Sequence, residues 1–93
     1  MYRPLLIEFW TMHPQSEIRL ATWYRNARKY TWKSHAELKA DIPSADYVGN
    51  GRYVFNVGQE YRIVAVVNFT RQAILLKWVG LHKDYDRIDA TTI

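Results

Sequence analysis

The chain of 93 residues contains no cysteine. Disulfide bridges, thiolate zinc sites and cysteine nucleophiles are therefore excluded. The longest apolar stretches cover only residues 63–67 and 73–76, far short of the roughly 20 residues that span a bilayer. The chain also does not begin with the charged and apolar pattern of a signal peptide. We therefore expect a soluble cytoplasmic protein without membrane contact.

Several catalytic motifs are missing as well. The sequence has no glycine-rich phosphate loop, no G-x-S-x-G and no G-x-G-x-x-G, so NTPase, hydrolase and dinucleotide-binding interpretations have no anchor. The three histidines are scattered and lack the H-x-x-x-H spacing of a metal site. We therefore expect no cofactor and no metal ion.

The residues that are present predict one α+β domain over residues 1–93. A hydrophobic content of 48% supplies a core for a chain of this length. Apolar spacing and capping signals predict helices over residues 5–12, 16–29 and 34–41. Three β-rich runs follow at residues 52–57, 61–69 and 73–81, and the short links between them favour an antiparallel meander. The middle run is apolar on both faces, which indicates a central strand.

Positive charge is concentrated between residues 19 and 39. This segment has six basic residues and one acid, whereas the remainder is close to neutral. The basic residues are Arg19, Arg25, Arg28, Lys29, Lys33 and Lys39. Aromatic residues lie between them, a pattern that suits a polyanion such as RNA. The alternative is a solvated helix face whose aromatic side chains point inward.

Two polar residues at the ends of apolar strands are candidates for chemistry. Arg62 begins the central run and His82 closes the last one. A guanidinium can bind a phosphate, and an imidazole can move a proton near neutral pH. If the second hairpin has an odd number of loop residues centred on Gln72, the two side chains face each other across the ladder. Such a pair could cleave RNA without a metal.

These residues also have ordinary structural explanations. Arg62 could pair with a carboxylate such as Glu60 at the rim of the sheet. A histidine at a strand end is often a surface residue without catalytic duty. Tyr85, three residues after the histidine, could stack on a base or hold a phosphate, while Lys77 and Arg52 could add positive charge. Catalysis and simple binding both remain open on the residues alone.

Short phrases along nearly the whole chain resemble the HigB family of bacterial toxins, within the RelE-like superfamily. In the second half they are residues 54–57, 61–67 and 77–86; in the first half they are residues 9–10, 13–14, 21–24, 32–33 and 43–46. The resemblance implies a RelE-like α+β fold and a ribosome-dependent mRNA endonuclease that acts in the ribosomal A site and leaves a 2′,3′-cyclic phosphate. It also implies a HigA-like helix-turn-helix antitoxin, through which alone the complex would bind operator DNA.

The resemblance also implies roles for single residues. Arg62 matches the arginine of the family's Tyr-Arg strand, which is expected to stabilise the scissile phosphate. His82 and Tyr85 match a His-x-x-Tyr pattern, with His82 as proton donor or base and Tyr85 as the stacking or phosphate-holding group. The remaining candidates for RNA contact are Arg28, Lys29, Lys33, Lys39, Arg52 and Lys77.

Two departures from the family pattern stand out. Relatives commonly have threonine where this chain has Leu81, so a hydroxyl beside the histidine is absent. Relatives also open with a short strand, whereas only residues 1–3 precede Pro4 here, so we expect either a minimal edge strand or a trimmed start. Because of Leu81, a second function is also considered, that of a catalytically silent RNA- or ribosome-binding module.

Overall fold

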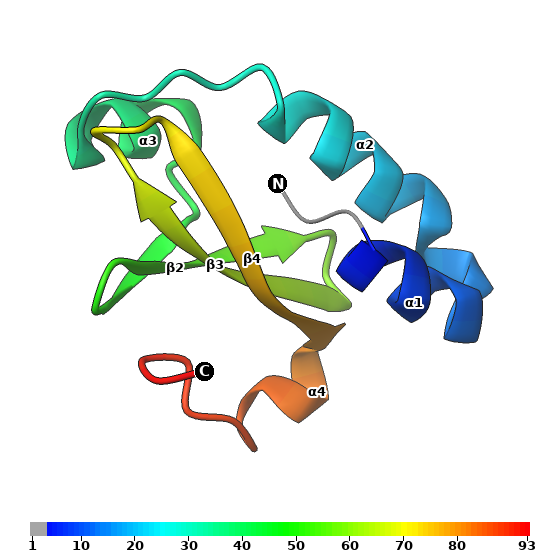
Figure 1. Cartoon of the computed structure of the whole chain (residues 1–93). Helices are drawn as coiled ribbons and strands as arrows, with labels where there is room; N and C mark the ends of the chain where they lie inside the picture. Colours follow the sequence, from blue (N-terminus) through cyan, green and yellow to red (C-terminus); the bar gives the residue numbers. More distant parts are fainter. Residues whose placement is uncertain (1–3) are drawn as a thin grey trace.

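Helices form the first half of the chain and strands most of the second half in a computed structural model that describes residues 4–93 (Figure 1). The elements are α1 (Pro4–Met12), the 3-10 helix η1 (Pro14–Ser16), α2 (Glu17–Ala27), α3 (His35–Asp41), β1 (Asp46–Gly49), β2 (Arg52–Val57), β3 (Tyr61–Asn68), β4 (Ala73–Leu81) and α4 (His82–Tyr85). The prediction of an α+β fold is confirmed. No helix in residues 4–93 is long and apolar enough to cross a membrane.

Helix boundaries follow from local chemistry. Pro14 opens a new turn after α1, and α2 buries Leu20 and Ala27. At the start of α3 the hydroxyl of Ser34 accepts the backbone N–H of Glu37 at 3.2 Å, and the Glu37 carboxylate accepts the backbone N–H of Lys33 at 3.1 Å. The reciprocal cap forms as expected, except that the carboxylate reaches one residue further back than in the usual capping box.

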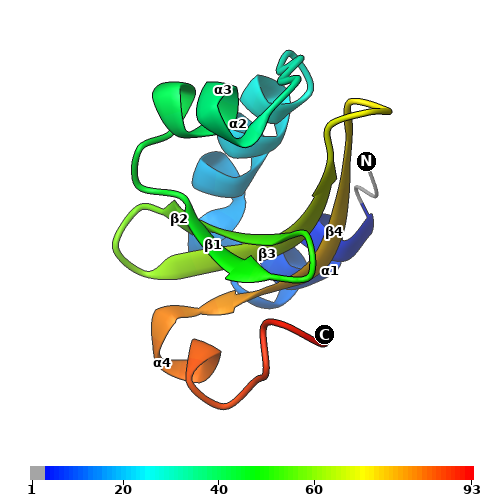
Figure 2. The same ribbon diagram turned by 90° about the vertical axis from the view of Figure 1, so that its left-hand side faces the viewer.

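The four strands form one antiparallel meander in the order β1-β2-β3-β4. The helices α1, α2 and α3 cover one face of this sheet, and α4 with the C-terminal residues covers the other (Figure 2). The strand β3 lies between β2 and β4, and Ile63, Val64 and Ala65 in its middle are fully buried. A central strand covered on both faces was predicted, and the structure confirms it.

A separate apolar cluster lies on each face of the sheet. The helix-side cluster is built on buried residues of all three long helical segments and of strands β2 to β4. The second cluster is smaller and centres on Val54, Val64 and Ala90, with Trp78 and Tyr85 packed against it. The C-terminal residues Ile88, Ala90 and Ile93 contribute apolar side chains to this second face. The polar candidates Arg62 and His82 lie at its border.

The register of the second hairpin does not meet the condition under which Arg62 would face His82 across the ladder. Asn68 pairs with Ala73, so the loop has four residues instead of an odd number centred on Gln72. Further along, Val64 pairs with Trp78 while Ala65 pairs with Leu76, which leaves Lys77 as the extra residue of a β-bulge. As a result Gly80, and not His82, is the residue opposite Arg62.

Two short elements were not predicted. The strand β1 has four residues and pairs with β2 across the turn at residues 49–51, and α4 is a single helical turn that follows β4 without a break. The expected minimal strand or trimmed start concerns residues 1–3, which lie outside the described part of the chain.

Candidate active site at the end of the sheet

Arg62 and His82 are in contact even though they are not partners in the ladder. Nη2 of Arg62 donates to Nε2 of His82 at 2.6 Å. A guanidinium has donors only, so the accepting imidazole nitrogen carries no hydrogen and the ring proton lies on Nδ1. The permanent cation therefore sits directly on the basic nitrogen of the imidazole.

Tyr85 supplies the second contact of the guanidinium. Cζ of Arg62 lies 4.7 Å from the centre of the Tyr85 ring, a cation–π distance that contributes about 1 kcal/mol when partly exposed. Tyr85 is the last residue of α4, so a single helical turn brings His82 and Tyr85 to the same guanidinium. The three residues of the predicted catalytic set are thus brought together in space.

No carboxylate in residues 4–93 neutralises this cation. In this part of the chain, the hydrogen-bond and cation–π partners of the Arg62 guanidinium are the imidazole and the phenol ring, and its buried Nε has no hydrogen-bond partner. The alternative pairing with Glu60 is not formed. Instead, the backbone carbonyl of Glu60 accepts the backbone N–H of His82 at 2.7 Å and fixes the start of α4 to the β2–β3 turn. An unpaired cation beside an imidazole is suited to an anionic ligand.

Leu81 explains what the departure from the family pattern does to this site. It is the residue before α4, at the helix N-cap, and it makes no side-chain cap. Its side chain packs against the helix-side cluster. A threonine at the same position could accept a backbone N–H of α4, because Ser and Thr favour N-caps. In this chain the helical turn that carries His82 depends on the Glu60 carbonyl instead.

Arg52 and Lys39 are engaged in bonds within the protein. Nε and Nη2 of Arg52 donate to the carbonyl of Ile93 at 3.3 and 2.9 Å, on the face covered by the C-terminal residues. The ammonium of Lys39 donates to the carbonyls of Pro43 and Ala45, just after α3. Both residues tie loops in place, and their part in RNA binding stays a prediction.

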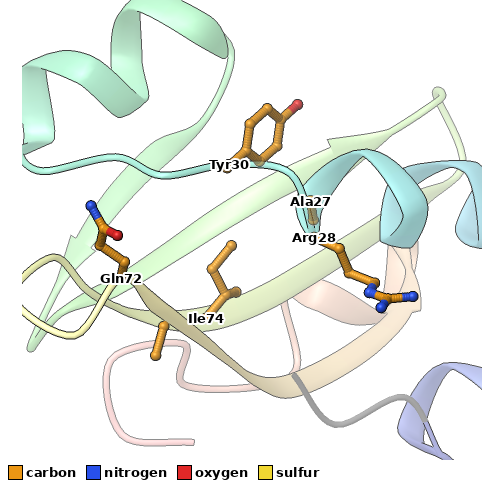
Figure 3. Close-up of a pocket in the computed structure, with 6 residues that line it drawn as sticks. Ala27, Arg28, Tyr30, Gln72 and Ile74 are labelled. Carbon is orange, nitrogen blue, oxygen red and sulfur yellow. The ribbon is translucent and has the colours of Figure 1, made fainter.

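The other predicted RNA-binding residues are exposed but lie apart from Arg62. Lys77 is exposed at the bulge of β4, and Lys29 and Lys33 are exposed between α2 and α3. Arg28 lines a hollow of 270 Å³ between the end of α2 and the start of β4, although its side chain extends away from the other labelled residues (Figure 3). Its guanidinium lies 5.8 Å from the centre of the Tyr24 ring.

The other two histidines have structural partners. The His13 ring stacks on Phe9 with ring centres 4.5 Å apart, and Nδ1 of His35 lies 2.6 Å from the hydroxyl of Tyr53. Burial raises the pKa of that tyrosine above its ordinary value. Across the described part of the chain, no three His, Asp or Glu residues are grouped so that they could hold a metal ion.

Two residues near the site were not among the predicted candidates. The indole of Trp78 lies 6.3 Å from the Tyr85 ring, centre to centre, and Gly80 is the ladder partner of Arg62. Trp78 shares a face of the sheet with Arg62, because its ladder partner Val64 lies two residues after Arg62 in β3. Nothing in the sequence indicated why the residue at position 80 is a glycine.

Comparisons with known proteins identify a family for this chain. A family model described as HigB_toxin, RelE-like toxic component of a toxin-antitoxin system, matches residues 16–88. The mRNA interferase toxin HigB of Escherichia coli (strain K12) is 38% identical over 78 residues, which cover 80% of this chain and 74% of the relative. The mRNA interferase HigB of Shigella flexneri gives the same values. A second mRNA interferase HigB, from Escherichia coli O6:H1, is 25% identical over 79 residues, covering 82% of this chain and 77% of the relative.

Proposed function

The chain belongs to the HigB family, the RelE-like toxic component of toxin–antitoxin systems, and we propose that it inhibits translation by cutting mRNA on the ribosome without a metal ion. It is thus the toxin of such a pair, its partner is an antitoxin, and its activity is that of an mRNA endoribonuclease. The ribosome, the catalytic residues and the nature of the antitoxin belong to the proposal.

The observation that carries the proposal is the contact between Arg62 and His82, with no carboxylate from the described residues 4–93 paired to the guanidinium. An entering phosphate would attract the guanidinium, whose donors then turn from the imidazole to the phosphate oxygens. This movement would also free the buried Nε, whose missing hydrogen bond costs about 1 to 3 kcal/mol. The cation would stabilise the charge that develops on the phosphorane.

His82 is then left with a free Nε2. It would take the proton of the 2′-hydroxyl as this oxygen attacks the phosphorus, or return a proton to the departing 5′-oxygen. The attack forms the bond from the 2′-oxygen to phosphorus and breaks the bond to the 5′-oxygen, so the product carries a 2′,3′-cyclic phosphate. Tyr85 would hold the guanidinium in place with the face of its ring.

The exposed basic residues between α2 and α3 would bind ribosomal RNA. Arg28, Lys29 and Lys33 are exposed in the segment between α2 and α3, where phosphate contacts would release counterions. Lys77 at the bulge is the exposed cation on β4 that we assign to the RNA path. The partner would be a HigA-like helix-turn-helix antitoxin, and operator DNA would be bound through that antitoxin alone.

A second function is favoured by one observation, the uncapped start of α4 at Leu81. A loosely held helical turn would leave His82 misplaced for proton transfer. The protein would then be a silent RNA- or ribosome-binding module that blocks translation without cutting.

Mapping of mRNA 5′ ends in translating cells tests the proposal. We expect brief induction of the wild type to produce new ends within translated regions, and His82→Gln to abolish them. His13→Gln is the matched control, because that histidine lies outside the site and should leave cleavage intact. Growth arrest without new ends would reject cleavage and support the binding module. New ends in untranslated as well as translated RNA would reject the ribosome dependence.

A further inference from the structure

The side chain of Trp78 occupies the space above Gly80. A Cβ on Gly80 would collide with Cζ2 and Cη2 of the indole, because the two residues lie on the same face of β4. Gly80 is buried and is the ladder partner of Arg62. The six-membered ring of Trp78 therefore stands where the side chain opposite Arg62 would otherwise be.

The same indole contacts the residue that holds the guanidinium. The rings of Trp78 and Tyr85 are 6.3 Å apart between centres and inclined by 59°. Tyr85 in turn lies beneath Arg62, whose Cζ is 4.7 Å from the ring centre. On its inner side Trp78 packs against the second cluster, next to its ladder partner Val64. A continuous line of packed groups thus runs from this cluster to the guanidinium.

We propose that Trp78 is a positioning residue that holds Tyr85, and through it the Arg62 guanidinium, against His82. Gly80 is required because any side chain there would displace the indole. The consequence for catalysis rests on the proposed function, whereas the positioning of Arg62 does not. If Trp78 served the core alone, its loss would lower stability without altering where the guanidinium lies.

A pair of size changes separates these two roles. Gly80→Ala adds a methyl group under the indole, and Trp78→Phe removes the ring that reaches over position 80. The double variant has room for the new methyl group, so it should behave more like Trp78→Phe than like Gly80→Ala. Leu75→Ala is the matched control, because Leu75 lies on the same face of β4 and is 50% exposed.

Two readouts are measured on the purified toxin. Protons of a guanidinium above an aromatic ring are shifted upfield, so the side-chain NMR signals of Arg62 report its place over Tyr85. Cleavage of mRNA in a translating lysate reports activity. We expect Gly80→Ala to lose the upfield shift and about 100-fold in cleavage rate, the scale of a small misplacement of a catalytic group. The double variant should instead match Trp78→Phe, with the part of the shift and of the activity that a smaller ring at position 78 retains.

The inference is wrong if folded Gly80→Ala keeps the wild-type signals of Arg62, or if the double variant is as defective as Gly80→Ala in both readouts. If Gly80→Ala does not fold, Trp78→Phe and the double variant are compared with the wild type. Equal Arg62 signals in all three proteins would also overturn the inference. Loss of the shift together with an inactive wild type would support the positioning role and reject the proposed function.

Discussion

Arg62 contacts His82 although the residue opposite Arg62 in the ladder is Gly80. The chain turns into α4 immediately after β4, and His82 folds back so that its Nε2 lies 2.6 Å from Nη2 of Arg62. The contact is therefore made by the end of a strand and the start of a helix. Its strength depends on the planar shape of the guanidinium as well as on its charge.

Arg62→Lys should remove most of the cleavage activity although it keeps the positive charge. A lysine ammonium is a point charge that cannot lie flat on the Tyr85 ring while donating to the oxygens of a phosphate. We expect a loss of at least about 100-fold, comparable to removal of one donor that stabilises an oxyanion. Cleavage in a translating lysate measures it. Arg71→Lys, in the exposed β3–β4 loop, is the control, and equal activity of both variants would contradict the role of Arg62.

Tyr85→Phe and Tyr85→Ala should differ, because the structure uses the face of the ring. Phenylalanine keeps the surface under the guanidinium and should retain most of the activity. Alanine removes a cation–π contact of about 1 to 2 kcal/mol, which corresponds to a loss of roughly tenfold. Rates of mRNA cleavage distinguish the two. A loss as large in Tyr85→Phe as in Tyr85→Ala would show that the hydroxyl, and not the ring face, carries the role.

Lys39→Met and Lys33→Met should separate a structural lysine from an RNA-binding one. The Lys39 ammonium donates to the carbonyls of Pro43 and Ala45, so its loss should lower the free energy of unfolding by about 1 kcal/mol. Lys33 is exposed, and its loss should reduce the salt dependence of ribosome binding by about one phosphate contact. Urea unfolding and binding to purified ribosomes at several salt concentrations test both. A reduced salt dependence in Lys39→Met alone would reverse the assignment.

Tyr61 should make the fold sensitive to alkali. Its side chain is 2% exposed, and burial raises the pKa of its hydroxyl above the ordinary value near 10. A raised pKa in the folded state means that stability is complete below the unfolded pKa and is lost as the pH rises through the folded one. Urea unfolding across this alkaline range should therefore show a falling free energy. In Tyr61→Phe the fall should be smaller, and an unchanged fall would assign it to other tyrosines.

The regular elements were predictable because their patterns are local. The bounds of β2 and β4 were predicted to the residue, and the capping pair Ser34 and Glu37 marked the start of α3. The strand β1 was not predicted because it has only four residues and none of them is buried, so it shows no apolar pattern. The helix α4 was not predicted because no capping side chain marks its start in the sequence.

The candidate site was only partly predictable. Its three residues followed from strand ends and from the family pattern, and the structure brings Arg62, His82 and Tyr85 together. The ladder pairing that would place Arg62 opposite His82 does not form, because the second hairpin has a four-residue loop, and no local pattern marks the bulge at Lys77 that follows. The role of Trp78 was also out of reach, since it depends on an empty position two residues away.

The bulge at Lys77 affects the direction of β4 and leaves its ladder pairs unchanged. Without Lys77, Leu76 and Trp78 would be consecutive and would still pair with Ala65 and Val64 in an unbroken ladder. What would be lost is the local bend and added twist that an extra residue gives a strand. The bend of β4 towards α4 thus depends on one extra residue in the strand. It depends on the number of residues and not on the kind of side chain, and it affects the position of His82.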